Sequence, residues 1–127
     1  MSGRPIGNRV LIVEDNWLVA VEAEASLLEA GYVVLGIAVS AEEAVALCEA
    51  ERPDFVLMDI RLRGDSDGVQ AAVEIRARFG IPSVFVSAHD DPETQARAGA
   101  AKPLGWIVKP VSGPELIKRV ESLRSCH

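Results

Sequence analysis

The sequence has 127 residues, of which 49% are hydrophobic and 25% charged, and these proportions are typical of one globular domain with a buried core. The net charge of −6 argues against a nucleic-acid-binding surface, because phosphate contacts need clustered Lys and Arg. No apolar run approaches the ~20 residues that cross a bilayer, and residues 1–5 lack the apolar core of a signal peptide. We therefore expect a cytoplasmic protein that does not bind nucleic acid or membrane directly.

Five short runs rich in β-branched residues predict β-strands. They cover residues 9–14, 33–38, 55–59, 83–87 and 105–109. Four of them are nearly continuous apolar runs without in–out alternation, as expected for strands of a parallel sheet that is covered on both faces.

An amphipathic segment follows the first run. Leu18, Val21, Ala25 and Leu28 recur at spacings of three, four and three, which is typical of one stripe along a helix. Gly31 stands where a glycine commonly ends a helix.

The other gaps between strands carry helix-start signals. Residues 40–43 and 112–115 both read S-x-x-E, the pattern of a capping box. Asp67 and Asp91 look like N-caps, and Pro92 suits the first position of a helix.

Strands and helices therefore alternate in the order βαβαβαβαβα. This order predicts an α/β fold with a parallel sheet, right-handed crossovers and helices on both faces. The last helix, near residues 112–124, ends almost at the end of the sequence. We expect a single domain over residues 1–127, with its core at about 9–124 and no output domain.

Chemically useful side chains stand at the predicted carboxyl ends of four strands. Glu14 and Asp15 close the first strand, Asp59 the third, Ser87 the fourth and Lys109 the fifth. Ligands of open α/β sheets bind beyond these ends, so the topology brings all five residues to one edge.

Their chemistry points to phosphoryl transfer. Three carboxylates repel one another unless a cation lies among them, and Mg²⁺ prefers oxygen ligands. A carboxylate can act as the nucleophile toward a phosphoryl group, with Lys109 compensating charge and the Ser87 hydroxyl donating to a phosphoryl oxygen. Each residue alone would more simply be a cap, a loop residue or a surface charge, and it is the joint pattern that indicates a site.

These residues resemble the receiver domains of two-component response regulators. The likeness runs from about residue 9 to residue 124, and its most specific segments are residues 10–16, 52–60, 86–88 and 106–110. The resemblance implies a flavodoxin-like, doubly wound (βα)5 fold with a five-stranded parallel sheet.

The resemblance also assigns roles. The phospho-acceptor would be Asp59, and Mg²⁺ would be held by Glu14, Asp15, Asp59 and the backbone carbonyl of Arg61. Ser87 and Lys109 match the family's hydroxyl and lysine, and the peptide bond from Lys109 to Pro110 would be cis. Ser87 and Trp106 occupy the positions of the switch residues.

The sequence departs from the family pattern at several positions. Arg63 replaces a common proline, and the loop over residues 61–68 looks one residue longer than usual. Trp106 is bulkier than the usual Tyr or Phe, so the read-out is expected to differ. Residues 100–104 replace a Gly-Ala approach to the fifth strand, which predicts a short or irregular fourth helix.

Four further residues, two cysteines and two histidines, are not assigned to a functional site. Cys48 and Cys126 are too isolated for a disulfide framework or a metal cluster and are interpreted as a small core residue and a tail residue. His89 stands at a position that tunes phosphoryl lifetime in the family, but a lone histidine is more often a solvated loop residue; His127 has no indicated role.

The implied function is a phosphorylation-activated switch of a phosphorelay, not an enzyme. Its partners would be a histidine kinase or histidine phosphotransfer protein and a downstream protein target, reached through the face formed by the fourth helix, fifth strand and fifth helix. The sequence leaves the oligomeric state open, with a homodimer as one option, and does not name the kinase or the target.

Three alternatives compete with this function. A phosphohydrolase with an aspartyl nucleophile would carry a second aspartate shortly after it, but Ile60 and Arg61 stand there. A flavin or dinucleotide binder would need a Gly-rich turn in place of residues 14–17. A receiver-like module that is never phosphorylated would not need to keep every reactive residue type.

Overall fold

The computed structural model describes residues 6–62, 67–88 and 91–125. Strands and helices alternate along the described chain as the sequence predicts. The strands are β1 (Arg9–Val13), β2 (Val33–Ala38), β3 (Phe55–Met58), β4 (Ser83–Ser87) and β5 (Gly105–Val108). The α-helices are α1 (Trp17–Glu29), α2 (Ala41–Glu51), α3 (Gly68–Phe79), α4 (Pro92–Ala98) and α5 (Gly113–Ser125).

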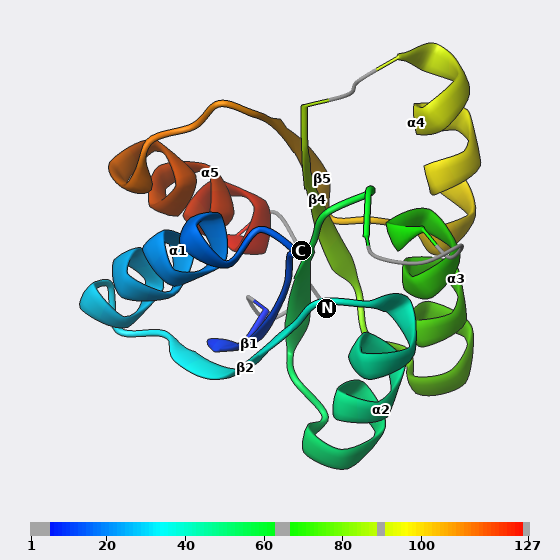
Figure 1. The fold of residues 1–127 in the computed structure, drawn as a ribbon, viewed down its shortest axis with the longest axis horizontal. Coiled ribbons are helices and arrows are strands. Elements are labelled where there is room, and N and C mark those ends of the chain that lie inside the picture. The colour runs from blue at the N-terminus through cyan, green and yellow to red at the C-terminus, as the bar shows by residue number, and fades with distance from the viewer. Residues whose placement is uncertain (1–5, 63–66, 89–90, 126–127) are drawn as a thin grey trace.

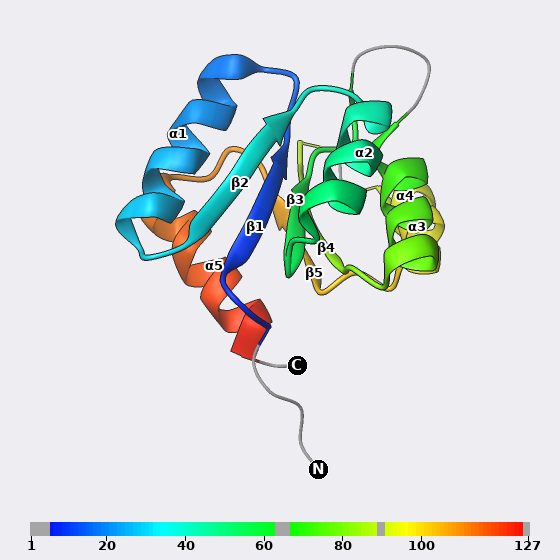
Figure 2. The ribbon, with the colours of Figure 1, turned by 90° about the horizontal axis from the view of Figure 1, so that it is seen from below.

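The strands form one five-stranded parallel sheet in the order β2-β1-β3-β4-β5. Helices α1 and α5 cover one face, and α2, α3 and α4 cover the other (Figures 1 and 2). This three-layer arrangement is the flavodoxin-like (βα)5 fold, so the predicted fold class is confirmed.

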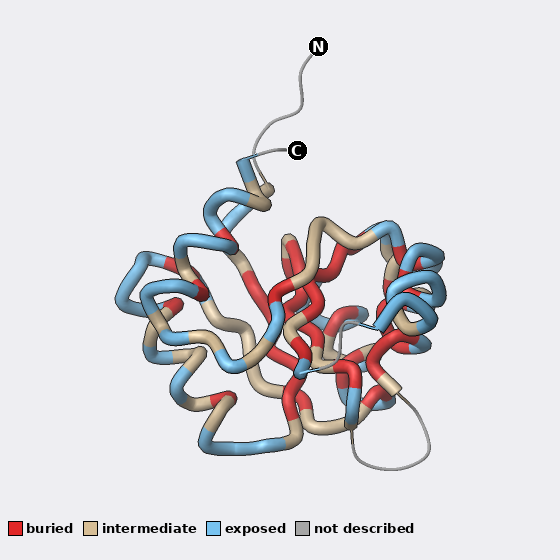
Figure 3. The backbone as a smooth tube through the Cα atoms, turned by 90° about the horizontal axis from the view of Figure 1, so that it is seen from above, coloured by how far each residue is buried: buried red, intermediate tan, exposed pale blue. Residues whose placement is uncertain are grey.

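Both faces of the sheet are covered by helices, and the central strands β1, β3 and β4 are almost fully buried, which explains their continuous apolar runs (Figure 3). Along β1, Leu11 and Val13 pack into the core beneath α2 and α3, whereas Val10 and Ile12 pack into the core beneath α1 and α5. Cys48 is fully buried in the first of these cores, as expected, and burial raises the pKa of its thiol to about 12.

The predicted helix starts are confirmed by their hydrogen bonds. The Ser40 side chain accepts from the backbone N–H of Glu43 at 3.2 Å, and Ser112 accepts from Glu115 at the same distance. Asp67 accepts from the N–H of Gln70, and Asp91 accepts from that of Thr94. Gly31, just past the end of α1, has the positive φ of 93° that a residue with a side chain rarely adopts.

The apolar stripe on α1 is not its buried face. Leu18 and Leu28 are 68% and 54% exposed, whereas Ala20 and Leu27 on the same helix are fully buried. The spacing predicts a helix here correctly but indicates the wrong side of it. Ala20 and Leu27 face the neighbouring layer, and Leu18 and Leu28 are left outside.

The fourth helix is short, as predicted. α4 has seven residues and passes directly into a 3₁₀ turn over Gly99–Ala101. Lys102, with a φ of 48°, then turns the chain toward β5. No helix among the described residues is long and apolar enough to cross a membrane.

Gly68, the first residue of α3, packs against the backbone at the end of β3. Its N–H donates to the Ile60 carbonyl at 2.6 Å, and a Cβ at this position would overlap the carbonyl oxygen of Asp59. The absence of a side chain at Gly68 therefore lets α3 begin directly beside Asp59.

We expect Gly68→Ala to lower the free energy of unfolding by about 1–3 kcal/mol, because the added methyl group must displace backbone atoms. Gly99→Ala is the matched control, since Gly99 has an α-helical backbone and a Cβ added there would have nothing within 4 Å. The control should be neutral or stabilising by up to about 1 kcal/mol. Urea denaturation of both variants measures the difference, and equal stabilities would contradict the proposed overlap.

Candidate functional site

Backbone hydrogen bonds continue past the strand ends and align the predicted site residues. The N–H of Glu14 donates to Ala38 at 2.9 Å, and the N–H of Asp59 donates to Val13 at 2.9 Å. On the other side of the sheet, the N–H of Lys109 donates to the Ser87 carbonyl at 2.8 Å. The parallel register therefore brings the ends of β1, β3, β4 and β5 to one edge, as predicted.

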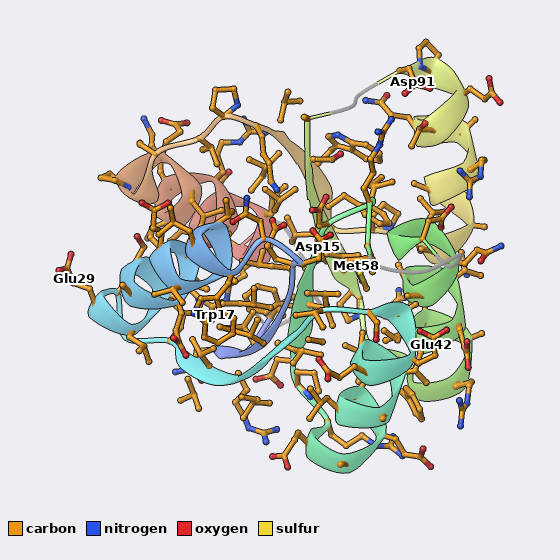
Figure 4. The ribbon with its side chains drawn as sticks, in the orientation of Figure 1. Asp15, Trp17, Glu29, Glu42, Met58 and Asp91 are labelled. Carbon is orange, nitrogen blue, oxygen red and sulfur yellow. The ribbon has the colours of Figure 1, made fainter. Side chains whose placement is uncertain are left out.

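Three carboxylates meet at this edge. One oxygen each from Glu14, Asp15 and Asp59 lies within 4.8 Å of the others. Glu14 is buried and the two aspartates are partly buried. Figure 4 labels Asp15, just after β1, and Met58, the residue before Asp59, near the centre of the view.

The ammonium of Lys109 bridges two of the carboxylates. Its Nζ lies 2.6 Å from Glu14 Oε1 and 3.5 Å from Asp59 Oδ2. Only 23% of the Lys109 side chain is exposed, so the contact is made in a partly desolvated place where charge interactions are strong. The peptide bond from Lys109 to Pro110 is cis, as predicted.

Charges and burial shift the proton affinities of this cluster. The pKa of Asp59 is raised to about 6, because burial and the adjacent Glu14 carboxylate together outweigh the lowering effect of Lys109. Burial alone would lower the pKa of Lys109, but the hydrogen bond to Glu14 and the two carboxylates outweigh it and raise this pKa. Lys109 is therefore a fixed positive charge at neutral pH.

The donor set fits a hard divalent cation. Carboxylate oxygens are the ligands that Mg²⁺ prefers, and these three lie close enough together to share one ion with water molecules. When all three are ionised, Lys109 compensates only one of their charges, which leaves a local charge that a divalent cation would neutralise.

The remaining predicted residues also lie at or near this edge. Ser87 is buried at the end of β4, paired in the sheet with Val108. The N–H of Arg61 donates to Asp59 Oδ1 at 3.4 Å, and the role of its carbonyl stays a prediction.

Trp106 is partly buried and packs against the core beneath α2 and α3. Its ring is tilted on that of Phe85, with 5.1 Å between the centroids, and its Nε1 is buried without a hydrogen-bond partner in the described structure. Whether it acts as a switch stays a prediction. The predictions for Arg63, His89, Cys126 and His127 fall outside the described residues.

Three polar contacts at or near the site were not predicted. The N–H of Asn16 donates to Glu14 Oε2 at 3.2 Å, while the Asn16 side chain caps α1 by accepting from Val19. Asp67, predicted only as a cap, also binds Arg97 of α4 at 2.8 Å. Burial alone would raise the pKa of Asp67, but the Gln70 N–H and Arg97 outweigh it and lower this pKa.

Comparisons with known proteins agree with this geometry. Residues 10–121 match the family model described as the response regulator receiver domain. The chain is 36% identical over 116 residues to the transcriptional regulatory protein PdtaR of Mycobacterium tuberculosis, covering 91% of this chain and 56% of PdtaR. It is 33% identical over 106 residues to the phyllosphere-induced regulator PhyR of Methylorubrum extorquens, covering 83% of this chain and 39% of PhyR.

Solved structures are similar over almost the whole chain. The signal receiver domain of a modulated diguanylate cyclase from Desulfovibrio desulfuricans G20 has a TM-score of 0.82 and 39% identity, covering 94% of this chain and 93% of that one. A CheY-like response regulator receiver domain protein from Methanospirillum hungatei JF-1 has a TM-score of 0.81 and 28% identity, covering 91% of this chain and 93% of that one.

The chain spans about half the length, or less, of the curated relatives it matches, so the activities of those whole proteins are not transferred to it. The matched family, the (βα)5 fold and the acidic edge agree with one another. The chain belongs to the response regulator receiver domains, the signalling domains of two-component systems.

Proposed function

We propose that the chain is a phosphorylation switch whose acceptor is Asp59. The observation that carries the proposal is the cluster at the end of β3. The Asp59 carboxylate lies beside Glu14 and Asp15 and 3.5 Å from the Lys109 ammonium. A nucleophilic carboxylate, oxygen ligands for a divalent cation and a compensating cation are the parts that phosphoryl transfer to an aspartate requires.

Each residue has a distinct part in this proposal. An Asp59 carboxylate oxygen attacks phosphorus, and the bond from phosphorus to the donor's leaving group breaks. The Lys109 ammonium can then compensate the charge of the phosphoryl oxygens, and the Ser87 hydroxyl at the end of β4 can donate to one of them. Glu14, Asp15, Asp59 and the Arg61 carbonyl would hold Mg²⁺, which supplies further charge compensation when bound.

The proposed donors are a histidine kinase or a histidine phosphotransfer protein. The proposed signal passes through the face of α4, β5 and α5 to a downstream protein target. Trp106 of β5 is suited to this read-out, because its ring packs on Phe85 of β4, two residues before Ser87. A cytoplasmic location is part of the proposal.

An aspartyl phosphohydrolase is the alternative chemistry. It would need a second catalytic aspartate shortly after Asp59, but the next residues are Ile60, which is buried, and Arg61, which is exposed. The nearby acids come from the end of β1 instead, where they suit metal binding. The signalling role is therefore the better-supported proposal.

Asp59→Asn should abolish labelling by a small acyl phosphate donor, because the amide is a poor nucleophile. Asp54→Asn is a matched control: Asp54 precedes the same strand at its other end, and its Oδ2 accepts from the N–H of Arg9, a bond that an amide oxygen can keep. Intact mass and peptide mapping locate the added phosphate. Labelling of Asp59→Asn at the wild-type level would refute the assignment.

Asp15→Ala should weaken Mg²⁺ binding by about tenfold or more, because it removes one ligand and one negative charge. Glu49→Ala removes an exposed carboxylate from α2, far from the cluster, and should leave the affinity unchanged. Calorimetric titration measures both. Phosphorylation in the presence of a chelator should also stop, and an undiminished rate would show that the metal site is wrong.

Trp106 emission should change when Mg²⁺ and beryllofluoride, an acyl phosphate mimic, bind to a Trp17→Phe variant. Trp17 is 63% exposed at the start of α1 and would otherwise dominate the signal. Adding Asp59→Asn to this variant should remove the change. An unchanged spectrum despite demonstrated binding of the mimic would mean that the protein signals without this aromatic residue.

A further inference from the structure

Helix α4 has few buried contacts to hold it in place. Of its seven residues, Ala98 is buried, Thr94 is partly buried and the others are exposed. The helix lies beside α3 (Figures 1 and 2), and an open groove of about 440 Å³ runs between them, lined by side chains of α3 and by Arg97 of α4. Because tertiary packing supplies most of the stability of a short helix, the position of α4 depends on contacts made across this groove.

Arg97 makes such a contact. Its Nη2 lies 2.8 Å from Oδ2 of Asp67, thirty residues earlier in the chain. The pKa of Asp67 is lowered, so its carboxylate is charged at neutral pH. The other oxygen of the same carboxylate, Oδ1, accepts from the N–H of Gln70 at 2.8 Å and caps α3. One side chain therefore fixes the start of α3 and also holds α4.

Asp67 is joined as well to the chain segment that follows the proposed acceptor. Arg61 and Asp67 pair as an antiparallel β-bridge, and the next residue, Gly68, donates its N–H to the Ile60 carbonyl at 2.6 Å. The N–H of Arg61 in turn donates to Asp59 Oδ1 at 3.4 Å. A continuous series of contacts therefore runs from α4, through Asp67, to the carboxylate of Asp59.

We propose that Asp67 is a positioning residue for Mg²⁺ binding at the phosphorylation site, and that Arg97 supports it from α4. The inference rests on the proposed function, in which the Arg61 carbonyl is a ligand of Mg²⁺ and Asp59 is the acceptor. The bridge to Asp67 holds Arg61 in place, and the ion pair with Arg97 holds Asp67. Breaking the pair loosens residues 59–61, which must then be ordered when the ion binds, and this ordering weakens the affinity.

A simple charge effect would act in the opposite direction at Arg97. If the guanidinium acted only through its electric field, Arg97→Gln would strengthen Mg²⁺ binding or leave it unchanged, because a positive charge is removed. If Arg97 acts by holding Asp67, the same change weakens Mg²⁺ binding. The sign of the effect therefore separates positioning from charge.

Calorimetric titration with Mg²⁺ should show about twofold to fivefold weaker binding by Arg97→Gln than by the wild type, because an exposed ion pair contributes up to about fivefold to an equilibrium constant. Arg78→Gln is the matched control. Arg78 is equally exposed, at 46%, and lies 2.9 Å from Glu74, but both residues of that pair belong to α3. The control should bind Mg²⁺ as tightly as the wild type, and urea denaturation checks that every variant is folded.

Three further variants test the route through Asp67. Asp67→Asn loses the ion pair but keeps the α3 cap, because asparagine is an equally good N-cap, and it should weaken Mg²⁺ binding to a similar degree. Combining it with Arg97→Gln should weaken binding no further, because both changes remove the same contact. Arg97→Lys should bind Mg²⁺ as the wild type does, since one nitrogen, Nη2, makes the pair and an ammonium can replace it.

A reciprocal measurement reports on α4 itself. Since coupling between two sites acts equally in both directions, saturating Mg²⁺ should slow amide hydrogen exchange in α4 by about twofold to fivefold in the wild type but not in Arg97→Gln. Unchanged exchange in the wild type, undiminished Mg²⁺ affinity of Arg97→Gln, or a return to wild-type affinity in the double variant would overturn the positioning role and leave the proposed function standing. Failure of the wild type to bind Mg²⁺ would overturn this role together with the proposed metal site.

Discussion

Three carboxylates at one sheet edge must be kept together against their mutual repulsion, and Lys109 is the group that does so. Its ammonium lies 2.6 Å from Glu14 and 3.5 Å from Asp59, and it comes from a strand on the far side of β4. The contact therefore forms only in the observed register of the sheet, and it stabilises that register in turn. Because breaking a half-buried pair leaves an uncompensated charge, the cluster can be maintained only while β1, β3 and β5 end level with one another.

The sequence was sufficient to predict the order of elements and which charged side chains meet at one edge of the sheet. Strands buried on both faces appear as continuous apolar runs, and the caps at Ser40, Asp67, Asp91 and Ser112 mark helix starts through short-range hydrogen bonds. Such signals depend on neighbours in the chain. The site residues could be grouped because parallel strands all end at the same edge, so that their order along the chain fixes their place.

What the sequence could not predict depends on contacts between distant elements. The stripe of Leu18 and Leu28 predicts the helix but not its buried side, which is decided by how closely α1 can approach the sheet. The need for a glycine at position 68 is visible only once α3 is seen against the carbonyl of Asp59. Likewise, no local pattern relates Arg97 of α4 to Asp67, thirty residues earlier.

The surroundings of Asp59 are asymmetric, and the asymmetry limits how a donor can approach. On the α3 side, Gly68 packs directly on the backbone of Asp59, so no atom of a ligand fits between them. On the α1 side, small side chains leave a cavity that opens onto Asp59 and Lys109. Close packing on one side fixes the position of Asp59, the proposed nucleophile, and the open space on the other leaves room for a leaving group. A donor, whether a small molecule or a protein, is therefore expected to place its leaving group on the α1 side of the sheet, beside the segment that joins β5 to α5.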